Sequence, residues 1–343
     1  MKYKILFFLL ALIAVFLYSQ RKLVIYGLQQ ASGQAKILIE AKPIETYLTD
    51  PDYPDSLKTK LEQIQRIKKY AEDSLGIKKS KNYTKMFDQH GDPIMFVLTA
   101  CEPFELKAKE WSFPFIGKFS YKGFFNLNEA KKERKQLQQQ GLDTNIRTAG
   151  AWSTLGWFND PILSNMLDYK TGRLAELIIH ELTHGTIFVK DSVQFNENLA
   201  TFIGHKGAVK YLKTYYGDTS RAYINYINGW HDSHKFDAYV LHGAKKMDSL
   251  YQSMQQQSLS IEQKEQLKTQ AIEQIIHNLD TVSFHENSRY PHYFDKYTPN
   301  NTFFMAYLRY NANYSLLEKD FKEKYNQNIK EYINDLKKKY PSL

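Results

Sequence analysis

Cysteine is nearly absent from this chain of 343 residues, because Cys101 is its one thiol. An intrachain disulfide and a metal site built from several thiolates are therefore excluded, and any metal must be held by His, Asp or Glu. The sequence also lacks a phosphate-binding loop of the G-x-G-x-x-G type and a G-x-S-x-G nucleophile elbow. These absences argue against a nucleotide enzyme and against an esterase.

Long blocks of like charge are missing too, although the chain is mildly basic. It contains 46 Lys and Arg against 37 Asp and Glu, which gives a formal net charge of +9. The lysines are scattered and interleaved with Glu and Gln, which is typical of a solvated surface, so no nucleic acid partner is expected. With 43% hydrophobic and 24% charged residues the chain can bury a globular core, and disorder is excluded.

The longest apolar run is at the N-terminus. Residues 5–18 contain no charge, follow Lys2 and Lys4, and precede Arg21 and Lys22. No small-x-small cleavage site follows, so an uncleaved signal anchor over residues 1–22 is favoured. Short as it is, the segment can span hydrocarbon if the basic residues at both ends snorkel. We expect a single-pass anchor in the cell membrane, with residues 23–343 outside the cytoplasm, in the periplasm.

The remaining chain predicts an α+β fold that is mostly α-helical. Apolar spacing of three and four residues predicts helices over residues 23–47 and 57–75, and Asn126 can cap a helix to residue 140. Short apolar or alternating segments predict a sheet of about four strands, at residues 94–98, 111–113, 118–125 and 144–152. Beyond Gly217 the pattern is mainly helical, with a hairpin tip at residues 258–260.

A metal-binding pattern follows the predicted sheet. His180, Glu181 and His184 form an HExxH motif inside a predicted helix over residues 173–189. Histidines four residues apart project from one helical face, where both imidazoles can bind one Zn²⁺. Glu181 is offset around the helix, so it can act as the general base on a water molecule that the zinc activates.

A third ligand decides whether this motif is a catalytic zinc site. A ligand six residues after the second histidine also requires Gly three residues after it, but those positions hold Lys190 and Ile187. Glu197 lies in the first turn of a second predicted helix, over residues 195–216, which a short turn can fold back against the first. Asp191 and His205 are alternative third ligands. Two histidines and one glutamate leave a position for water, which is typical of catalytic zinc.

Beyond these residues, the sequence resembles the bacterial putative aminopeptidase family. The likeness covers nearly the whole chain after the anchor, and the motifs that carry it are the HExxH helix followed by Phe195-Asn196-Glu197, Gly33-Gln34, residues 111–114 with Gly117, residues 121–123, residues 153–158 with Asp160-Pro161, and Asn300-Asn301. The asparagine before the glutamate is also similar to the wider gluzincin peptidases.

The resemblance implies a zincin-like domain with a small β-sheet before the HExxH helix. It implies one Zn²⁺ per chain bound by His180, His184 and Glu197, Glu181 as the base, and a peptide substrate. Many relatives begin as lipoproteins with an N-terminal Cys, which this chain lacks, so its membrane attachment would be through the apolar segment.

The sequence specifies two other parts of a peptidase site less closely, namely the oxyanion donor and the groups that bind the substrate. An oxyanion donor is usually Tyr or His, and a small-residue strand end at residues 149–152 could pair with a peptide backbone. Glu176 and Asp160 could hold the α-ammonium group of a substrate. The candidate oxyanion donors are His231, His234, His285, His292, Tyr290, Tyr293, Tyr307 and Tyr310.

The competing interpretation is a non-catalytic, membrane-anchored envelope protein that keeps the helix pair as a scaffold. Glu181 discriminates between the two, because a scaffold needs the two histidines whereas only catalysis needs that carboxylate.

Overall fold

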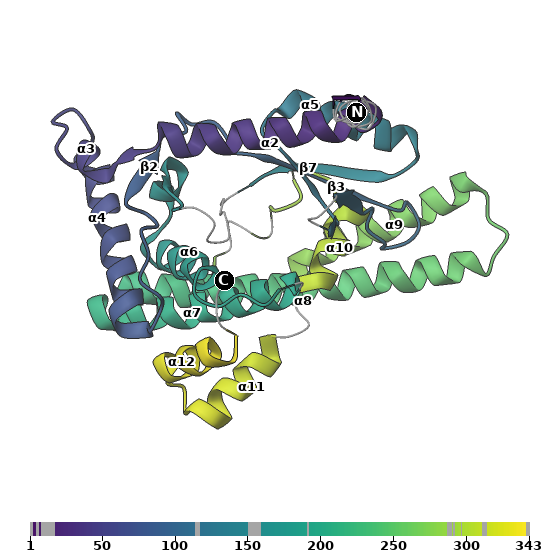
Figure 1. Cartoon of the computed structure of the whole chain (residues 1–343). Coiled ribbons are helices and arrows are strands. Elements are labelled where there is room, and N and C mark those ends of the chain that lie inside the picture. The colour runs from purple at the N-terminus through teal and green to yellow at the C-terminus, as the bar shows by residue number, and fades with distance from the viewer. Residues whose placement is uncertain are drawn as a thin grey trace.

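The computed structural model describes residues 3–4, 7, 18–113, 117–149, 159–190, 192–286, 290, 292–295, 297–310 and 314–340. The described chain is mostly helical with small sheets, in agreement with the α+β prediction (Figure 1). The helices are α2 Arg21–Glu40, α3 Ile44–Leu48, α4 Asp55–Tyr70, α5 Leu127–Gln139, α6 Thr171–His184, α7 Val193–Tyr216, α8 Arg221–Gln255, α9 Ile261–Asn278, α10 Asn301–Tyr310, α11 Tyr314–Tyr325 and α12 Ile329–Lys339. Short helical turns are η1 Ala71–Leu75, η2 Ser164–Asp168 and η3 Leu279–Thr281.

The described strands form three small sheets, so the prediction of a single sheet is wrong. The strands are β1 Lys42–Pro43, β2 Lys85–Phe87, β3 Phe96–Cys101, β4 Trp111–Phe113, β5 Gly117–Phe119, β6 Lys122–Phe124, β7 Asp143–Thr148 and β8 Ile162–Leu163. Their orders are β1-β2-β8, β6-β3-β7 and β4-β5. β2 pairs in parallel with β8, from a distant part of the chain. Both strands are too short to show a periodic pattern in the sequence.

Helix α2 lies along one side of the body (Figure 1). Its inner face packs on β4 and β6, where the ring of Tyr26 stacks on Phe113 with 5.5 Å between centroids and its hydroxyl donates to the carbonyl of Gly123. Gly33 lies directly against the ring of Phe125, which leaves no room for a side chain. The helix ends before Pro43, since proline lacks an N–H and favours an extended residue before it, and the predicted helix over residues 23–47 is therefore two helices, α2 and α3.

Helices α6 and α7 form an antiparallel pair in the main hydrophobic core. Helix α6 ends at His184, five residues before the predicted end. The reason is local: the hydroxyls of Thr183 and Thr186 bond to carbonyls one turn back, and the N–H groups of Thr186 and Ile187 both bond to Thr183 in a tight turn.

The predicted helical hairpin is confirmed. Helix α8 ends at Gln255 and α9 begins at Ile261, where Ser260 and Gln263 form a capping box. The two helices enclose a second hydrophobic core, in which Phe236, Phe284 and Tyr290 pack together.

No helix in the described part of the chain is long and apolar enough to cross a membrane. Most of the apolar run at residues 5–18, within the predicted anchor over residues 1–22, lies outside the described residues.

Candidate metal centre

Three side chains from α6 and α7 converge at one point. The Nε2 atoms of His180 and His184 lie 3.2 Å apart, and the two carboxylate oxygens of Glu197 lie 3.6 and 3.5 Å from them. A tetrahedral ion with ligand bonds of about 2.0–2.1 Å requires its ligands to be about 3.3 Å from one another. The three side chains therefore fit one small metal ion, and together they form a group that could hold one.

Asn196, the residue before Glu197, fixes the loop between the two helices. Its side-chain oxygen accepts the N–H of Val189 at 2.9 Å, and its amide group donates to the carbonyl of Val189 at 2.8 Å. Asn196 is buried. The side chain of Asn196 thus pairs with the backbone of the loop as a neighbouring strand would. Glu197 is the next residue, one turn into α7.

The crossing of α6 and α7 depends on Gly204. A Cβ atom there would lie 2.9 Å from the carbonyl oxygen of Glu176 and 3.2 Å from Cβ of His180. The two helices can approach this closely only where α7 carries no side chain. Gly204 thereby lets the helix that carries Glu197 lie against the helix that carries the histidines.

The protonation states favoured for His184 and Glu197 suit a cation. Burial and the charge of His180 lower the pKa of His184, which favours a neutral ring. Burial alone would raise the pKa of Glu197, but its close contact with His180 and the charges of both histidines lower it, so the carboxylate stays ionised. For His180, burial lowers the pKa, but the contact with Glu197 and the nearby carboxylates raise it overall, which favours the charged ring until a metal binds. Neutral imidazole and ionised carboxylate are the forms that bind metal.

Glu181 lies beside this group without belonging to it. Burial raises the pKa of its carboxyl to about 7; the charge of His180 opposes this rise, while Glu197 and Asp160 add to it. A carboxyl group with such a pKa can take up and release a proton near neutral pH, which is the property of a general base.

Tyr83 is a neighbour of Glu181 that the sequence did not indicate. Burial, and then the negative charges of Glu181 and Asp160, raise the pKa of its hydroxyl well above the ordinary value. The backbone N–H of Tyr83 donates to the carbonyl of Asp160 at 2.7 Å, and its φ of 62° is in the left-handed region, which is rare outside glycine. Tyr83 is far from the motif in sequence, and its backbone conformation leaves no sequence signal.

His205, one of the two alternative third ligands, does not join the group. His205 stacks on Trp230 with 4.1 Å between centroids, and its Nδ1 bonds to the hydroxyl of Tyr226, so it faces α8. Asp191 lies outside the described residues. The described structure thus brings Glu197, and not His205, to the histidine pair.

Most of the candidate oxyanion donors that the structure describes have partners other than the metal-binding group. Tyr290 and Tyr307 pack in the second core around Phe236, and the exposed Tyr293 lies against the same ring. His285 bonds to the buried Asp232, His292 pairs with Asp295 on the surface, and His231 is exposed. The side chain of Tyr310 and most of the small-residue strand end at residues 149–152 lie outside the described residues.

Both candidate ammonium-binding acids are buried. Glu176 is ion-paired with Arg173 at 2.6 Å. Asp160 lies under the Tyr83 turn, where its N–H donates to the side chain of Asn82. The structure therefore shows neither carboxylate as an open binding group.

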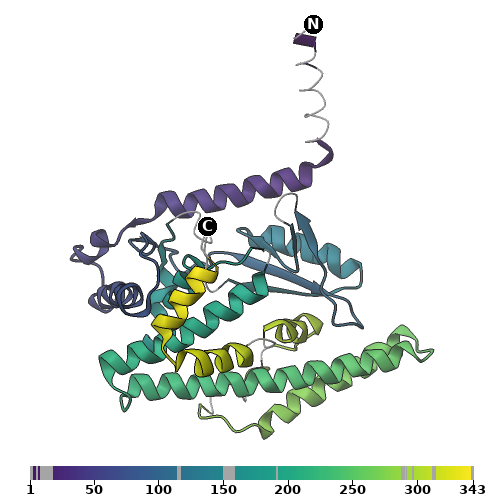
Figure 2. The ribbon, with the colours of Figure 1, turned by 60° about the horizontal axis from the view of Figure 1, so that its bottom comes forward.

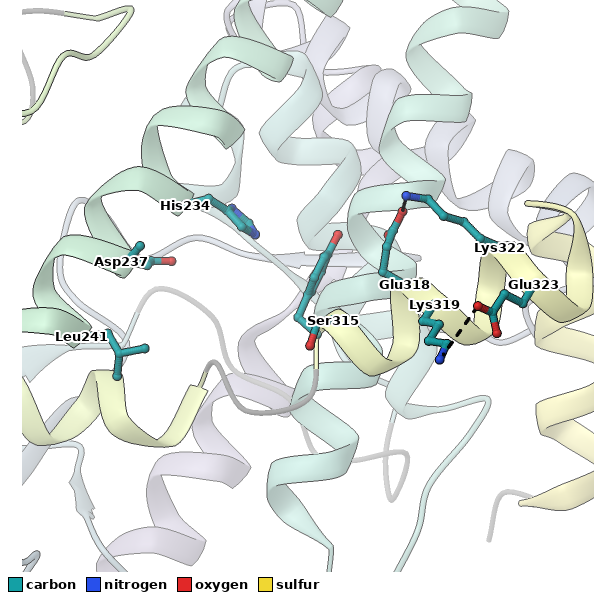
Figure 3. A pocket seen from close by; sticks show the side chains of 10 residues that line it. His234, Asp237, Leu241, Ser315, Glu318, Lys319, Lys322 and Glu323 are labelled. Carbon is teal, nitrogen blue, oxygen red and sulfur yellow. Dashed lines mark ion pairs between the residues drawn. The ribbon is translucent and has the colours of Figure 1, made fainter. Parts of the chain in front are cut away.

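A pocket of about 660 Å³ lies between α8 and α11, and none of its lining residues is a predicted metal ligand. Figure 3 shows His234, Asp237 and Leu241 on the α8 side, opposite Ser315 and Glu318 of α11. Burial raises the pKa of Asp237 to about 6. His234, a candidate oxyanion donor, packs on Trp230 with 3.7 Å between centroids, and Trp230 in turn stacks on His205 of α7.

The family of putative aminopeptidases matches this chain over residues 25–340. The match covers most of the chain and both helices of the metal-binding group, so the chain belongs to the putative aminopeptidase family. Membership supports a peptidase. None of the curated proteins and none of the solved structures matches the chain.

Proposed function

We propose that the chain is a zinc-dependent metallopeptidase of the HExxH, gluzincin-like type, and that it acts as an aminopeptidase. The observation that carries the proposal is the convergence of His180, His184 and Glu197 at the mutual distances of a tetrahedral site, with Glu181 beside them. Their residue types favour zinc, which prefers imidazole and carboxylate ligands in this set. The family match supports peptide substrates.

In the proposed mechanism, residues of the chain hold the ion, position its ligands and transfer a proton. His180, His184 and Glu197 hold the ion, and Asn196 and Gly204 position those ligands. Bound zinc supplies Lewis acidity, which makes water acidic enough to lose a proton near neutral pH and polarises a carbonyl group. Glu181 accepts that proton as the water attacks the peptide carbonyl, and then delivers it to the leaving amine.

Residues 23–343 form the peptidase domain in this proposal, with one zinc ion per chain. Residues 1–22 anchor it to the cell membrane, and the domain faces the periplasm, where its partners are peptides. The apolar run between the basic residues of the N-terminus supports this placement.

The first test measures zinc per chain in the purified full-length protein and in Glu197→Ala. We expect about one zinc in the wild type and much less in the variant, because loss of a ligand removes much of the binding free energy. Absence of zinc from a folded wild type would contradict the proposal.

The second test separates catalysis from metal binding. Glu181→Gln should keep the zinc and lose peptide hydrolysis, since the amide cannot accept the proton. Substrate pairs with a free and an acetylated N-terminus then distinguish an aminopeptidase from an endopeptidase. Zinc-loaded wild type that cleaves neither substrate, or Glu181→Gln that cleaves as well as wild type, would favour the scaffold interpretation or another mechanism.

A further inference from the structure

The outer face of α2 carries four exposed apolar side chains, with the exposed Ser32 among them. Ile25, Leu28 and Ile39 are 53%, 66% and 80% exposed, and the small Ala35 lies exposed between the last two. At about 3.6 residues per turn these positions fall on one side of the helix. We call these four residues the outer stripe.

The outer stripe is not needed to attach α2 to the body. The opposite face does this: Tyr26 and Gln30 both donate to the carbonyl of Gly123, and Ile37 is buried in the main core. Helix α2 therefore has apolar side chains on two sides, and only the inner ones have partners among the described residues. A surface helix would ordinarily present polar residues on its outer side.

The charge around the outer stripe is basic. Helix α2 contains Arg21, Lys22 and Lys36, and Glu40 is its single acidic residue. In the sequence, the apolar run at residues 5–18 precedes α2 and is separated from it by Ser19 and Gln20. In Figure 2 the N-terminal end of the chain lies beyond α2, on the side away from the sheets.

We propose that the outer stripe of α2 lies in the interface of a bilayer that contains anionic phospholipid, with the helix axis parallel to the membrane surface. Apolar side chains at one face of a helix insert below the headgroups, and flanking Lys and Arg side chains attract anionic lipid. A single row of apolar residues with basic residues on the same helix has this chemistry.

This contact would orient the whole molecule. The α6–α7 pair lies on the side of α2 that faces the body (Figures 1 and 2). The group formed by His180, His184 and Glu197 would then be held away from the lipid, on the aqueous side of the domain.

The test uses the full chain reconstituted with vesicles of phosphatidylethanolamine and phosphatidylglycerol. A fluorophore sensitive to polarity is attached to Leu28→Cys, to Ile39→Cys and, as a control, to Ile261→Cys, which is 70% exposed at the tip of the α8–α9 hairpin. Cys101 is buried and does not compete for the label. We expect the labels at 28 and 39 to shift to shorter wavelength and to lose intensity when the lipids carry a quencher, and the label at 261 to do neither.

A charge variant extends the test. With the fluorophore on Ile25→Cys, the double change Leu28→Glu and Ile39→Glu should abolish quenching by lipid. The matched double change Ile261→Glu and Leu316→Glu, at sites 70% and 63% exposed outside α2, should leave it intact.

Flotation of the chain with the vesicles separates the contact from the anchor. A chain that floats with the vesicles but whose labels at 28 and 39 are not quenched by lipid overturns the inference and leaves the anchor standing. A spectral shift that depends on protein concentration and not on lipid quencher would show a second copy on the stripe, and would also overturn it. A chain that does not float overturns both.

Discussion

At the scale of single residues, Asn196 and Glu197 divide two tasks between neighbouring positions. Glu197 reaches the histidine pair, whereas Asn196 turns away from it and bonds twice to the backbone of Val189. Asn196 therefore fixes the loop that leads into α7, the helix that carries Glu197, and its effect on metal binding is indirect.

Asn196→Ala should lower zinc affinity about 10- to 100-fold, the usual effect of removing a group that orients a ligand. The matched control is Asn198→Ala, because Asn198 is also buried but bonds only one turn back, to Gln194 of its own helix. Competition with a chromophoric chelator measures both affinities. Equal losses in the two variants would mean that the Val189 contact does not position Glu197.

A second residue-scale prediction concerns Asp232, which is fully buried. Burial would raise its pKa, but hydrogen bonds from the N–H groups of His285 and Glu286 and from the His285 ring lower it. A carboxylate with a lowered folded pKa stabilises the protein above its unfolded pKa, about 3.9, and this contribution is lost as the pH falls through the folded value.

Asp232→Asn should therefore cost about 1.5–3 kcal/mol near neutral pH and less in acid. Urea unfolding at a series of pH values measures the difference. The control is Asp295→Asn, which breaks an exposed Asp–His pair and should cost less than about 1 kcal/mol. A loss in Asp232→Asn that does not depend on pH would contradict the assignment.

The sequence indicated His180, Glu181, His184 and Glu197 because their chemistry depends on spacing along two helices. His180, His184 and Glu197 converge in the structure with Glu181 beside them, while the roles of all four stay predictions until metal and turnover are measured. Tyr83 could not be found in this way, because it reaches Glu181 only through the folded chain.

At the scale of elements, the order of helices and the α8–α9 hairpin were predictable, but helix ends and sheets were not. The predicted helix over residues 173–189 stops at His184, where threonine hydroxyls compete for backbone carbonyls. The sheets were misjudged because β2 and β8 have only three and two residues and pair across a long stretch of chain. Pairing between distant short segments has no local pattern to reveal it.

The α6–α7 crossing gives a prediction with an internal control. Gly204→Ala should lower zinc affinity and destabilise the protein by about 1–3 kcal/mol, because the new methyl group meets the backbone of Glu176 and the start of the His180 side chain. Gly207→Ala meets mainly the ends of the flexible Ile179 and Leu75 side chains. It should change stability with little effect on zinc. Similar zinc affinity in both variants would argue that the crossing distance does not set the ligand geometry.

At the scale of the whole molecule, Asn301 joins the β6-β3-β7 sheet to the helices of the second core. Its N–H donates to Asp143 of β7, its amide group to the carbonyls of Glu102 and Pro103, and its oxygen accepts the hydroxyl of Tyr251. Asn301 is fully buried and uses each of these groups. These bonds give a structural role to Asn301, which belongs to one of the motifs that carry the family resemblance.

Asn301→Ala should destabilise the protein by about 3 kcal/mol or more, because it leaves two carbonyls and one hydroxyl without partners. Tyr251→Phe removes one of these bonds and should cost about 1 kcal/mol. Hydrogen exchange should increase in β7, α8 and α10 of the Asn301 variant and stay unchanged in α6. Faster exchange spread evenly over the chain would show that Asn301 does not stabilise specifically the contact between the sheet and the second core.

Helix α12 also has a consequence for the order in which the molecule assembles. Ile329, Tyr332 and Ile333 complete the main core, and Lys330 and Lys337 donate to the carbonyls of Asp73 and Gly76 near the start of the domain. Contacts between such distant segments form slowly, because a long loop of chain must close first. While the chain is still emerging, α4, α6 and α7 therefore present uncovered apolar surface, and the nascent protein needs protection from aggregation until α12 has arrived.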